Sequence, residues 1–355
     1  MPVWAHSLPA LGAALMAASF FVPMGGALAA ACGLALIGAV VAAVHHAEVV
    51  AHRVGEPFGT LVLAVAITVI EVALIVSLML AGGPDKATLP RDTIYSAVMI
   101  ICTGVVGICL LAGGLSHHEQ SFRLEGTNSA LAALVALAGL SLVMPTFTTS
   151  SSVGTYTVSQ LVFVAASSLA LCAVFVFVQT VRHRDYFLPR EDANNEAVHA
   201  LPPAPLLAWT SFALLLVSLV VVVGLAKQLS PAIEAAVAAA GAPKTVIGIA
   251  IALLVLLPET WAAVRAALAN RLQTSMNLAL GSALASIGLT IPAVVVTATV
   301  LDLPLVLGLD AKDLVMLALT FVVSTFTLGT GRTNVMQGAV HLVLFAAFLF
   351  LSLVP

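Results

Sequence analysis

The charged residues of this chain are gathered into short clusters, and long apolar segments without Asp, Glu, Lys or Arg separate these clusters. Only 8% of the 355 residues are charged, 61% are hydrophobic, and the mean hydropathy is +1.14. A soluble domain is about one quarter charged, because polar groups have to cover its surface. The pattern therefore predicts a membrane protein and excludes a soluble enzyme or a disordered regulator. With a net charge of −3 and no basic run, it also excludes a nucleic-acid binder.

The charge-free segments predict eleven membrane-spanning helices, because about 20 apolar residues are needed to cross a bilayer. The first 47 residues hold no charged side chain, which is room for two helices with a break at Pro23-Met24-Gly25-Gly26. A second double segment, from Glu125 to Arg182, is divided by the polar run that starts at Pro145. The other seven helices are expected in 56–85, 92–119, 196–227, 244–265, 271–302, 313–332 and 332–355.

The N-terminal segment contains Ala27-Leu28-Ala29, which has the small residues of a signal-peptidase site. The first 40 residues hold no Lys or Arg, so the basic region of a signal peptide is missing, and we expect the first helix to stay in the protein. Eleven spans place the termini on opposite sides of the membrane, with eight of the thirteen basic residues on the N-terminal side. The positive-inside rule then predicts a multi-pass protein of the cell inner (plasma) membrane with a cytoplasmic N-terminus.

Two acidic residues, Glu71 and Glu259, interrupt apolar segments near their middle. Each costs roughly 2.5–3.5 kcal/mol at the centre of a bilayer, so such residues persist where they face a cavity, a partner or an ion. The alternative is a pair of protonated glutamates that hydrogen-bond between helices. Acids within membrane spans mark ion and proton pathways, which favours the functional interpretation.

The two glutamates lie five spans apart, in the third and the eighth predicted helix. A unit with an odd number of spans is followed by its copy in the opposite orientation, and inverted repeats with a midplane site are typical of secondary transporters. The sequence therefore predicts an all-α polytopic membrane protein with about eleven transmembrane helices in two inverted repeats. The expected parts are an extra N-terminal helix (1–23), a first five-helix repeat (24–182), a cytoplasmic linker (183–204) and a second five-helix repeat (205–355).

Hydroxyl side chains near the two glutamates complete a candidate ion site. They belong to Thr68, Thr103, Ser282 and Ser286. Thr68 lies three residues before Glu71 and therefore on the same helix face, and the two serines share a face of the helix that follows Glu259. Oxygen ligands suit a hard cation such as Ca²⁺ or Na⁺, for which the two glutamates would be the metal ligands. Such hydroxyls are also common at plain helix contacts, which stays the alternative for each of them.

Four motifs resemble those of the Ca²⁺:cation antiporter superfamily, in its cation/proton exchanger branch. They are Gly55-Glu-Pro-Phe-Gly-Thr60 before the Glu71 helix, Pro258-Glu-Thr260 with Asn277-Leu-Ala-Leu-Gly-Ser-Ala-Leu-Ala-Ser286, Gly113-Gly-Leu-Ser-His-His-Glu-Gln-Ser-Phe122, and Gly331-Arg-Thr-Asn-Val-Met-Gln-Gly338. The chain is similar to bacterial sodium–potassium/proton and calcium/proton antiporters over nearly its whole length. The resemblance implies one extra helix plus two inverted five-helix repeats, with Glu71 and Glu259 as the central carboxylates and Ser282, Ser286 and Thr103 lining the site.

The chain also departs from the family pattern. Where the family has Gly-Asn-Ala-x-Glu, this chain has Ile67-Thr-Val-Ile-Glu71 and Val255-Leu-Leu-Pro-Glu259, so that Thr68 and Leu256 replace the two asparagines. The ion preference is therefore open among Na⁺, Ca²⁺ and K⁺.

These observations predict a secondary antiporter that exchanges cytoplasmic cations for external protons. Removal from water favours the neutral form of a carboxyl group, whereas a bound cation favours its charged form, so protons and cations would compete for the two glutamates. The expected partners are the lipid bilayer, inorganic cations and protons, with no resident cofactor, no ATP and no nucleic acid.

Histidine and glutamate residues cluster near the predicted cytoplasmic ends of the helices. They are His45, His46, Glu48, His52, Glu56, His117 and His118. Histidine titrates near neutrality, which fits proton entry or pH sensing, but polar loop residues normally just face water. His341, within the last span, is interpreted as a helix–helix hydrogen bond rather than as a ligand.

Other classes of membrane protein fit the sequence less well. An intramembrane enzyme is disfavoured, because the chain has no His-Glu-x-x-His motif, and an ATP-driven pump lacks the Gly-x-x-x-x-Gly-Lys-Ser/Thr motif. The four cysteines lie in apolar segments without a Cys-x-x-Cys pair and are expected to be buried hydrophobes. A proton-coupled permease for a small organic solute remains the alternative function.

Overall fold

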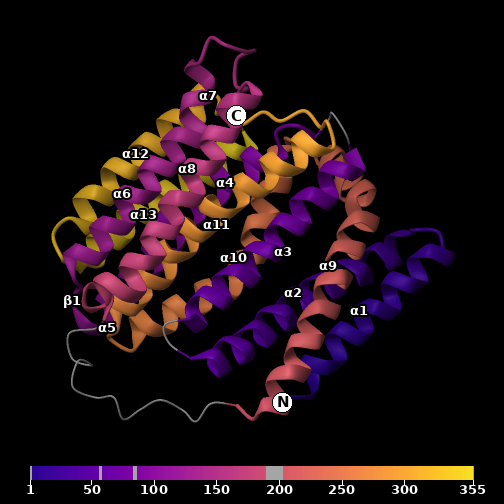
Figure 1. Ribbon diagram of the computed structural model, residues 1–355, viewed down its shortest axis with the longest axis horizontal. Coiled ribbons are helices and arrows are strands. Elements are labelled where there is room, and N and C mark those ends of the chain that lie inside the picture. Colours follow the sequence, from indigo (N-terminus) through magenta and orange to yellow (C-terminus); the bar gives the residue numbers. More distant parts are fainter. Residues whose placement is uncertain (1, 56–57, 83–85, 189–202, 355) are drawn as a thin grey trace. The chain divides into compact units, whose positions relative to one another are not determined.

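A computed structural model describes residues 2–55, 58–82, 86–188 and 203–354 of the chain, and nearly all of them are helical (Figure 1). Helices satisfy every backbone N–H and C=O group within one segment, which lipid cannot do for them. The predicted all-α polytopic fold is confirmed.

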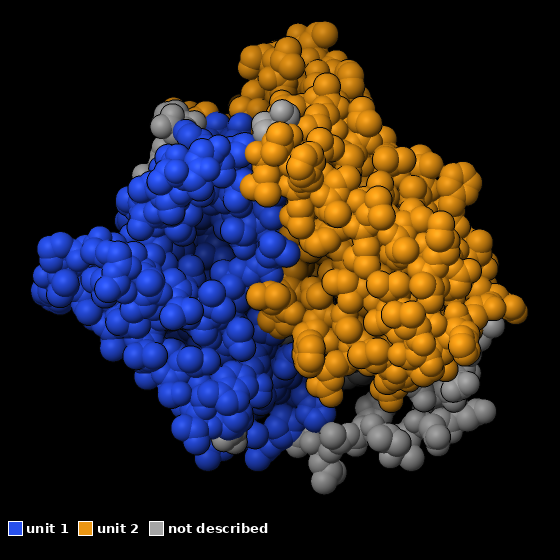
Figure 2. Space-filling model, turned by 180° about the vertical axis from the view of Figure 1, so that it is seen from behind, with its two compact units in different colours: residues 1–89, 200–255 blue, residues 90–199, 256–355 orange. Residues whose placement is uncertain are grey.

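The chain forms two compact units, which Figure 2 colours blue and orange. Unit 1 comprises residues 1–89 and 200–255, and unit 2 comprises residues 90–199 and 256–355. The helices of unit 1 are α1 (Val3–Phe21), α2 (Gly26–Val54), α3 (Phe58–Gly82), α9 (Pro205–Ala239) and the first half of α10 (Thr245–Leu268).

Unit 2 holds the second half of α10 and the remaining elements. Three of its helical segments are continuous although the helix type changes within them. They are α4 (Leu89–Met99) with η2 (Ile100–Val105) and α5 (Val106–His117); α6 (Leu124–Ala138) with η3 (Gly139–Val143) and α7 (Met144–Phe147); and α8 (Val158–Phe177) with η4 (Val178–Arg182). The others are β1 (Glu119–Ser121), η5 (Arg184–Phe187), α11 (Leu272–Val300), α12 (Ala311–Leu328), β2 (Arg332–Asn334) and α13 (Val335–Leu353).

The predicted spans agree with these helices. In the described part of the chain, ten helices are long and apolar enough to cross a membrane. Helix α3, whose described apolar stretch is the shorter Val65–Leu80, lies where the remaining span was predicted. The break predicted at Pro23 lies between α1 and α2. The polar run predicted as a break starts at Pro145, within α7, and the chain leaves the helix after Phe147 and enters α8 at Val158. Large apolar side chains such as Phe21, Phe163 and Val220 are exposed, as expected for helices that face lipid.

The helices extend beyond the charge-free segments that predicted them. The span predicted in 196–227 was expected to end at Lys227. The helix that forms it, α9, continues to Ala239 and includes Glu234. Asp92 and Asp313 likewise lie in the first turns of α4 and α12. The reason is physical: charge-free segments mark the lipid-buried part of a helix, and helical hydrogen bonding continues where the helix leaves the lipid.

Each compact unit takes helices from both halves of the chain. Unit 1 contains the first two helices of the first predicted repeat, and of the second it contains the first helix and the first half of α10. Unit 2 contains the second half of α10 and the last three helices of each repeat. The repeat boundaries at 24–182 and 205–355 stay predictions, since the compact units follow a different division.

Glycine residues allow close helix packing in unit 1. Helix α1 packs against α2 and α9, and the three lie side by side in Figure 1. Gly12 faces Val221 of α9, Gly38 faces Leu8 of α1, and a side chain at either glycine would crowd its neighbour. Small residues are the usual means by which membrane helices approach each other, because lipid supplies no hydrophobic drive for association.

In unit 2, α13 packs closely against η2 and α5. Gly107 contacts Leu342, and Gly338 lies so near to Leu111 that an added methyl group would overlap its backbone nitrogen. The strands β1 and β2 pair antiparallel at the end of these helices, with Gln120 opposite Thr333. This pairing, which was not predicted, joins the two motifs at 113–122 and 331–338.

Substitution of Gly338 by Ala should therefore lower the stability of the protein by about 1–3 kcal/mol, because α13 has to move away from α5. Gly33, in α2, has open space around it, so Gly33→Ala is the matched control and should be neutral or slightly stabilising. Thermal unfolding in detergent measures the difference. Equal midpoints for both variants would contradict the close approach.

Candidate functional site

Glu71 lies in the middle of α3, in unit 1. Its side chain is only 3% exposed, and Thr68, one turn earlier on the same face, is 4% exposed. Helix α3 is apolar on nearly all sides and packs against α2 and α9. A carboxyl group at this position is therefore removed from bulk water.

Glu259 lies in α10, in unit 2, and is half-buried. The hydroxyl of Ser282, on α11, donates a hydrogen bond to its carboxylate. Ser286 is buried one turn further along α11. The structure thus brings together two of the predicted site residues, and the serine that donates its hydrogen keeps its oxygen lone pairs for other partners.

Thr103 is fully buried in η2, and its hydroxyl donates to the carbonyl oxygen of Met99. The segment η2 is a π-helix, which interrupts the α-helical pattern between α4 and α5. Such π-helical turns occur frequently at functional sites, because the extra residue changes the direction of side chains and carbonyl groups. Hydrophobic periodicity did not predict this turn.

His341 connects α13 to two other elements of unit 2. Its Nδ1 lies 2.7 Å from the carbonyl oxygen of Cys102 in η2, and its Nε2 lies 3.1 Å from Oγ1 of Thr327 in α12. A carbonyl oxygen only accepts, so Nδ1 carries the proton, and the Thr327 hydroxyl donates to Nε2. The interpretation of His341 as a helix–helix hydrogen bond is confirmed.

His46 is fully buried in α2, with its Nε2 2.9 Å from the carbonyl oxygen of Ala5 in α1. Ala5 needs this donor because Pro9, four residues later, has no N–H to offer. The rings of His45 and of His6, which the sequence pattern did not single out, lie 5.7 and 6.4 Å from the His46 ring. His46 therefore holds α1 to α2, and its predicted part in proton entry stays a prediction.

The other predicted polar residues are spread over both units. Glu48 and His52 are exposed on α2 in unit 1, and Glu56 lies outside the described residues. In unit 2, Nε2 of His117 lies 2.9 Å from the carbonyl oxygen of Leu268 at the end of α10, and His118 is exposed with a φ of 61°. The two groups belong to different units, and their role in proton entry or pH sensing stays a prediction.

Across the described residues, no group of three or more His, Cys, Asp or Glu side chains could hold a metal ion. The four cysteines are buried thiols, as predicted. The oxygen atoms available near Glu259 come from hydroxyl groups, which bind alkali and alkaline-earth cations rather than transition metals.

An all-helical membrane fold with an acid inside a membrane-spanning helix in each half of the chain is typical of secondary ion transporters. The family model described as sodium/calcium exchanger protein matches residues 24–181 and 210–354. The chain is 50% identical over 360 residues to the ionic transporter y4hA of Sinorhizobium fredii, covering 100% of this chain and 97% of the relative. It is 38% identical over 322 residues to the sodium-potassium/proton antiporter ChaA of Escherichia coli, covering 89% of this chain and 87% of that protein.

The fold also matches solved structures. The structure of native YfkE superimposes with a TM-score of 0.73 at 18% identity, covering 99% of this chain and 100% of that chain. The chain belongs to the sodium/calcium exchanger protein family. The resemblance inferred from the four motifs is confirmed, and the relatives are ion transporters rather than enzymes.

The contact between His46 and Ala5 leads to a stability prediction. His46→Leu should lower the stability by about 1–2 kcal/mol, because the Ala5 carbonyl loses its donor inside the helix pair. His46→Gln should restore most of it, since an amide N–H can replace Nε2–H, and His52→Leu, at an exposed position, is the control. Thermal unfolding in detergent separates the variants. If His46→Leu proves as stable as His46→Gln, this hydrogen bond is not what ties the two helices together.

Proposed function

We propose that this protein exchanges cytoplasmic cations, Na⁺, Ca²⁺ or K⁺, for external protons by alternating access across the plasma membrane, with its N-terminus in the cytoplasm. Glu71 and Glu259 are the groups that bind either the cation or protons. The family membership supports the exchange reaction, and the two acids within membrane-spanning helices support the site.

The observation that carries the proposal is the hydrogen bond from Ser282 to Glu259. It joins the second and the third helix of the second predicted repeat, α10 and α11, at a carboxylate inside a membrane-spanning helix. A carboxylate with a donated hydroxyl beside it offers several oxygen atoms to one cation.

Thr103 holds the corresponding place in the first predicted repeat, because it lies in the third helix of that repeat as Ser282 lies in the third helix of the second. We therefore keep Thr103 as a candidate ion ligand of unit 2, and Thr68, on the same face of α3 as Glu71, as a candidate ion ligand of unit 1. The π-helical turn around Thr103 supports this assignment, because it gives this part of the helix a geometry of its own.

Competition explains the coupling. A Ca²⁺ ion held by two carboxylates neutralises them, as two protons do, and Na⁺ or K⁺ does so together with one proton, whereas the empty charged site is costly to bury. Only the cation-loaded and the protonated forms then change their access between the two sides. Exchange follows because the empty site cannot return by itself.

The names of related proteins indicate which cations to test. ChaA is a sodium-potassium/proton antiporter, and YfkE is described as a Ca²⁺/H⁺ antiporter. In this chain Thr68 stands where the family pattern has asparagine, so Na⁺, K⁺ and Ca²⁺ all belong in the first flux assay.

Glu71→Gln and Glu259→Gln should each reduce cation-driven proton flux by about 100-fold, since a hydrogen bond or ion contact to a charged group contributes about 1.5–3 kcal/mol. Inverted membrane vesicles with a pH-sensitive dye measure the flux on addition of Na⁺, K⁺ or Ca²⁺. Glu125→Gln, at an exposed position in the first turn of α6, is the control and should exchange normally. Near-normal flux in both the Glu71→Gln and the Glu259→Gln variant would refute the proposed site.

Ser282→Ala should weaken the apparent cation affinity by about tenfold, the effect of losing one hydrogen bond of about 1–1.5 kcal/mol to Glu259. Ser282→Thr keeps the hydroxyl and should retain most of the affinity. The concentration of cation at half-maximal flux is the measurement. An affinity that Ser282→Ala leaves unchanged would remove Ser282 from the ligand set.

A further inference from the structure

The π-helical turn η2 changes the hydrogen bonding of the backbone beside Thr103. In an α-helix, the N–H of Val106 would donate to the carbonyl of Cys102, four residues earlier. Here it donates to the carbonyl of Ile101, five residues earlier, and to that of Thr103. The Cys102 carbonyl therefore loses the donor that an α-helix would give it, inside a segment whose six residues are all buried.

His341 of α13 supplies a donor to this carbonyl. Its Nδ1 lies 2.7 Å from the Cys102 oxygen, and its side chain is fully buried. Because a carbonyl oxygen only accepts, Nδ1 carries the proton, and the Thr327 hydroxyl, 3.1 Å from Nε2, donates to the other side of the ring. Thr327 thus favours the tautomer that can donate to the turn. A buried carbonyl without a donor is costly, so the π-helical form depends on this contact.

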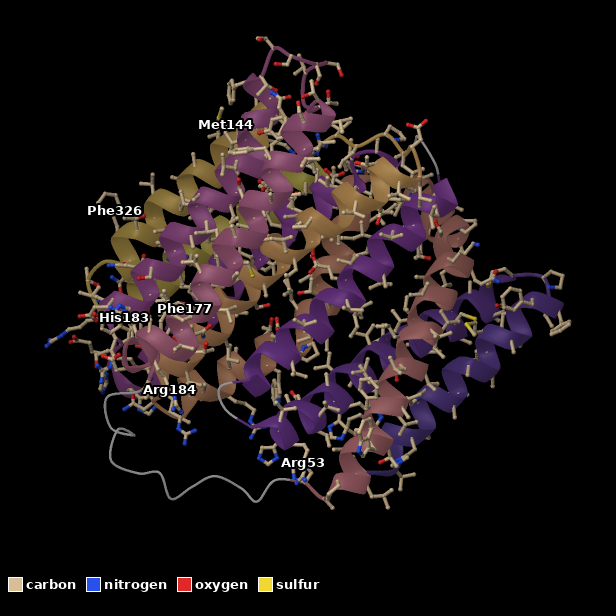
Figure 3. The ribbon with its side chains drawn as sticks, in the orientation of Figure 1. Arg53, Met144, Phe177, His183, Arg184 and Phe326 are labelled. Atoms are coloured by element: carbon tan, nitrogen blue, oxygen red, sulfur yellow. The ribbon has the colours of Figure 1, made fainter. Side chains whose placement is uncertain are left out.

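A second π-helical turn of unit 2, η3, has the same arrangement. The N–H of Met144, labelled in Figure 3 at the end of this turn, donates to the carbonyl of Gly139, five residues earlier. The Leu140 carbonyl therefore loses its α-helical donor, and the next residue, Pro145, has no N–H. The hydroxyl of Tyr156, in the loop before α8, donates to the Leu140 oxygen at 2.7 Å. In both turns, a side chain from another segment donates to the carbonyl that the turn deprives of its α-helical donor.

Close helix packing brings His341 to η2. A Cβ atom at Gly107, just after the turn, would lie 3.1 Å from the Cβ atom of His341. A Cβ atom at Gly104, within the turn, would lie 3.2 Å from the ring of Phe345. A larger residue at either glycine would push α13 away and separate Nδ1 from the Cys102 oxygen.

We propose that His341 is a positioning residue, which holds residues 100–105 in the π-helical form and thereby sets where the Thr103 side chain lies. In the α-helical form, Val106 would satisfy the Cys102 carbonyl, and His341 would not be needed. Without the extra residue of the π-turn, the side chains before and after it would rotate relative to each other by about 100°, the angle between neighbouring residues of an α-helix. The inference rests on the proposed function, in which Thr103 is a candidate ion ligand.

The first test removes the donor and measures transport. His341→Leu should raise the cation concentration at half-maximal flux by about tenfold and change the maximal rate less, because Thr103 leaves its place while the rest of the site stays. His341→Gln should recover most of the affinity, since its amide N–H can donate to Cys102 and its amide oxygen can accept from Thr327.

Tyr156→Phe is the matched control, because it removes the corresponding donor from η3, which holds none of the proposed ion ligands. It should leave the half-maximal concentration unchanged. Thr327→Val keeps the imidazole but frees Nε2 to carry the proton, and should raise that concentration by about two- to threefold even if the His341→Leu protein does not fold. An unchanged concentration in both His341→Leu and Thr327→Val, or an equal change in Tyr156→Phe, would overturn the proposal.

The second test does not depend on transport. The chain has four cysteines, so isotope labelling of the cysteine carbonyl carbons gives four backbone NMR signals, and Cys102→Ala identifies the one from the turn. His341→Leu should move this signal and His341→Gln should return it towards its original position, because a carbonyl carbon responds to its hydrogen-bond donor. The signals of Cys32 in α2 and Cys172 in α8 are the internal controls and should stay in place.

The NMR signal separates failure of this proposal from failure of the proposed function. A Cys102 signal that His341→Leu leaves in place would overturn the proposal even if the protein exchanges cations. If the signal responds as expected in a chain that exchanges no cation, the proposed function fails and the dependence of the turn on His341 stands.

Discussion

Every polar group inside a membrane has to find its partner within the protein, and the rest of this structure depends on that constraint. It explains the nearly complete helicity, because helices satisfy their own backbone. It also explains the hydrogen bonds between helices at polar groups that their own helix leaves without a partner. Where Pro9 leaves the Ala5 carbonyl without a donor, His46 of the neighbouring helix supplies one. Where α10 places the Glu259 carboxylate within its span, Ser282 of α11 donates to it.

Satisfying these groups requires helices that approach closely. Gly338 on α13 and Gly107 on α5 remove the side chains that would keep these helices apart, so that His341 can reach the Cys102 carbonyl in the π-helical turn. The same turn holds Thr103, and the buried imidazole of His341 hydrogen-bonds to the backbone of this turn. Packing through glycine and hydrogen bonding through polar side chains are thus two parts of one arrangement, which supports the candidate ion site.

Much of the fold could be predicted because the free-energy cost of a charged side chain in lipid depends on that residue and not on distant parts of the chain. Each charge-free segment contains a helix, and the chain leaves one helix for the next at Pro23 and within the polar run that follows Pro145. The end of α9 was misplaced at Lys227 because a helix can continue outside the lipid. The π-helical turn at Thr103 and the pairing of β1 with β2 escaped prediction, since an inserted residue or a contact between distant segments leaves no trace in hydropathy.

The sequence by itself determined the membrane class, the number of spans, the family and the two acids within spans, Glu71 and Glu259. Each of these follows from residue type and spacing along the chain. Only the tertiary structure decided that Ser282 donates a hydrogen bond to Glu259 and that His46 hydrogen-bonds to the Ala5 carbonyl of α1. It also decided that Thr127, whose hydroxyl has no partner among the described residues, lines a pocket with Gly281. Such contacts depend on how far two helices rotate and approach, and these quantities are set by side-chain packing between segments that lie 23 residues apart for Ser282 and Glu259 and 41 apart for His46 and Ala5.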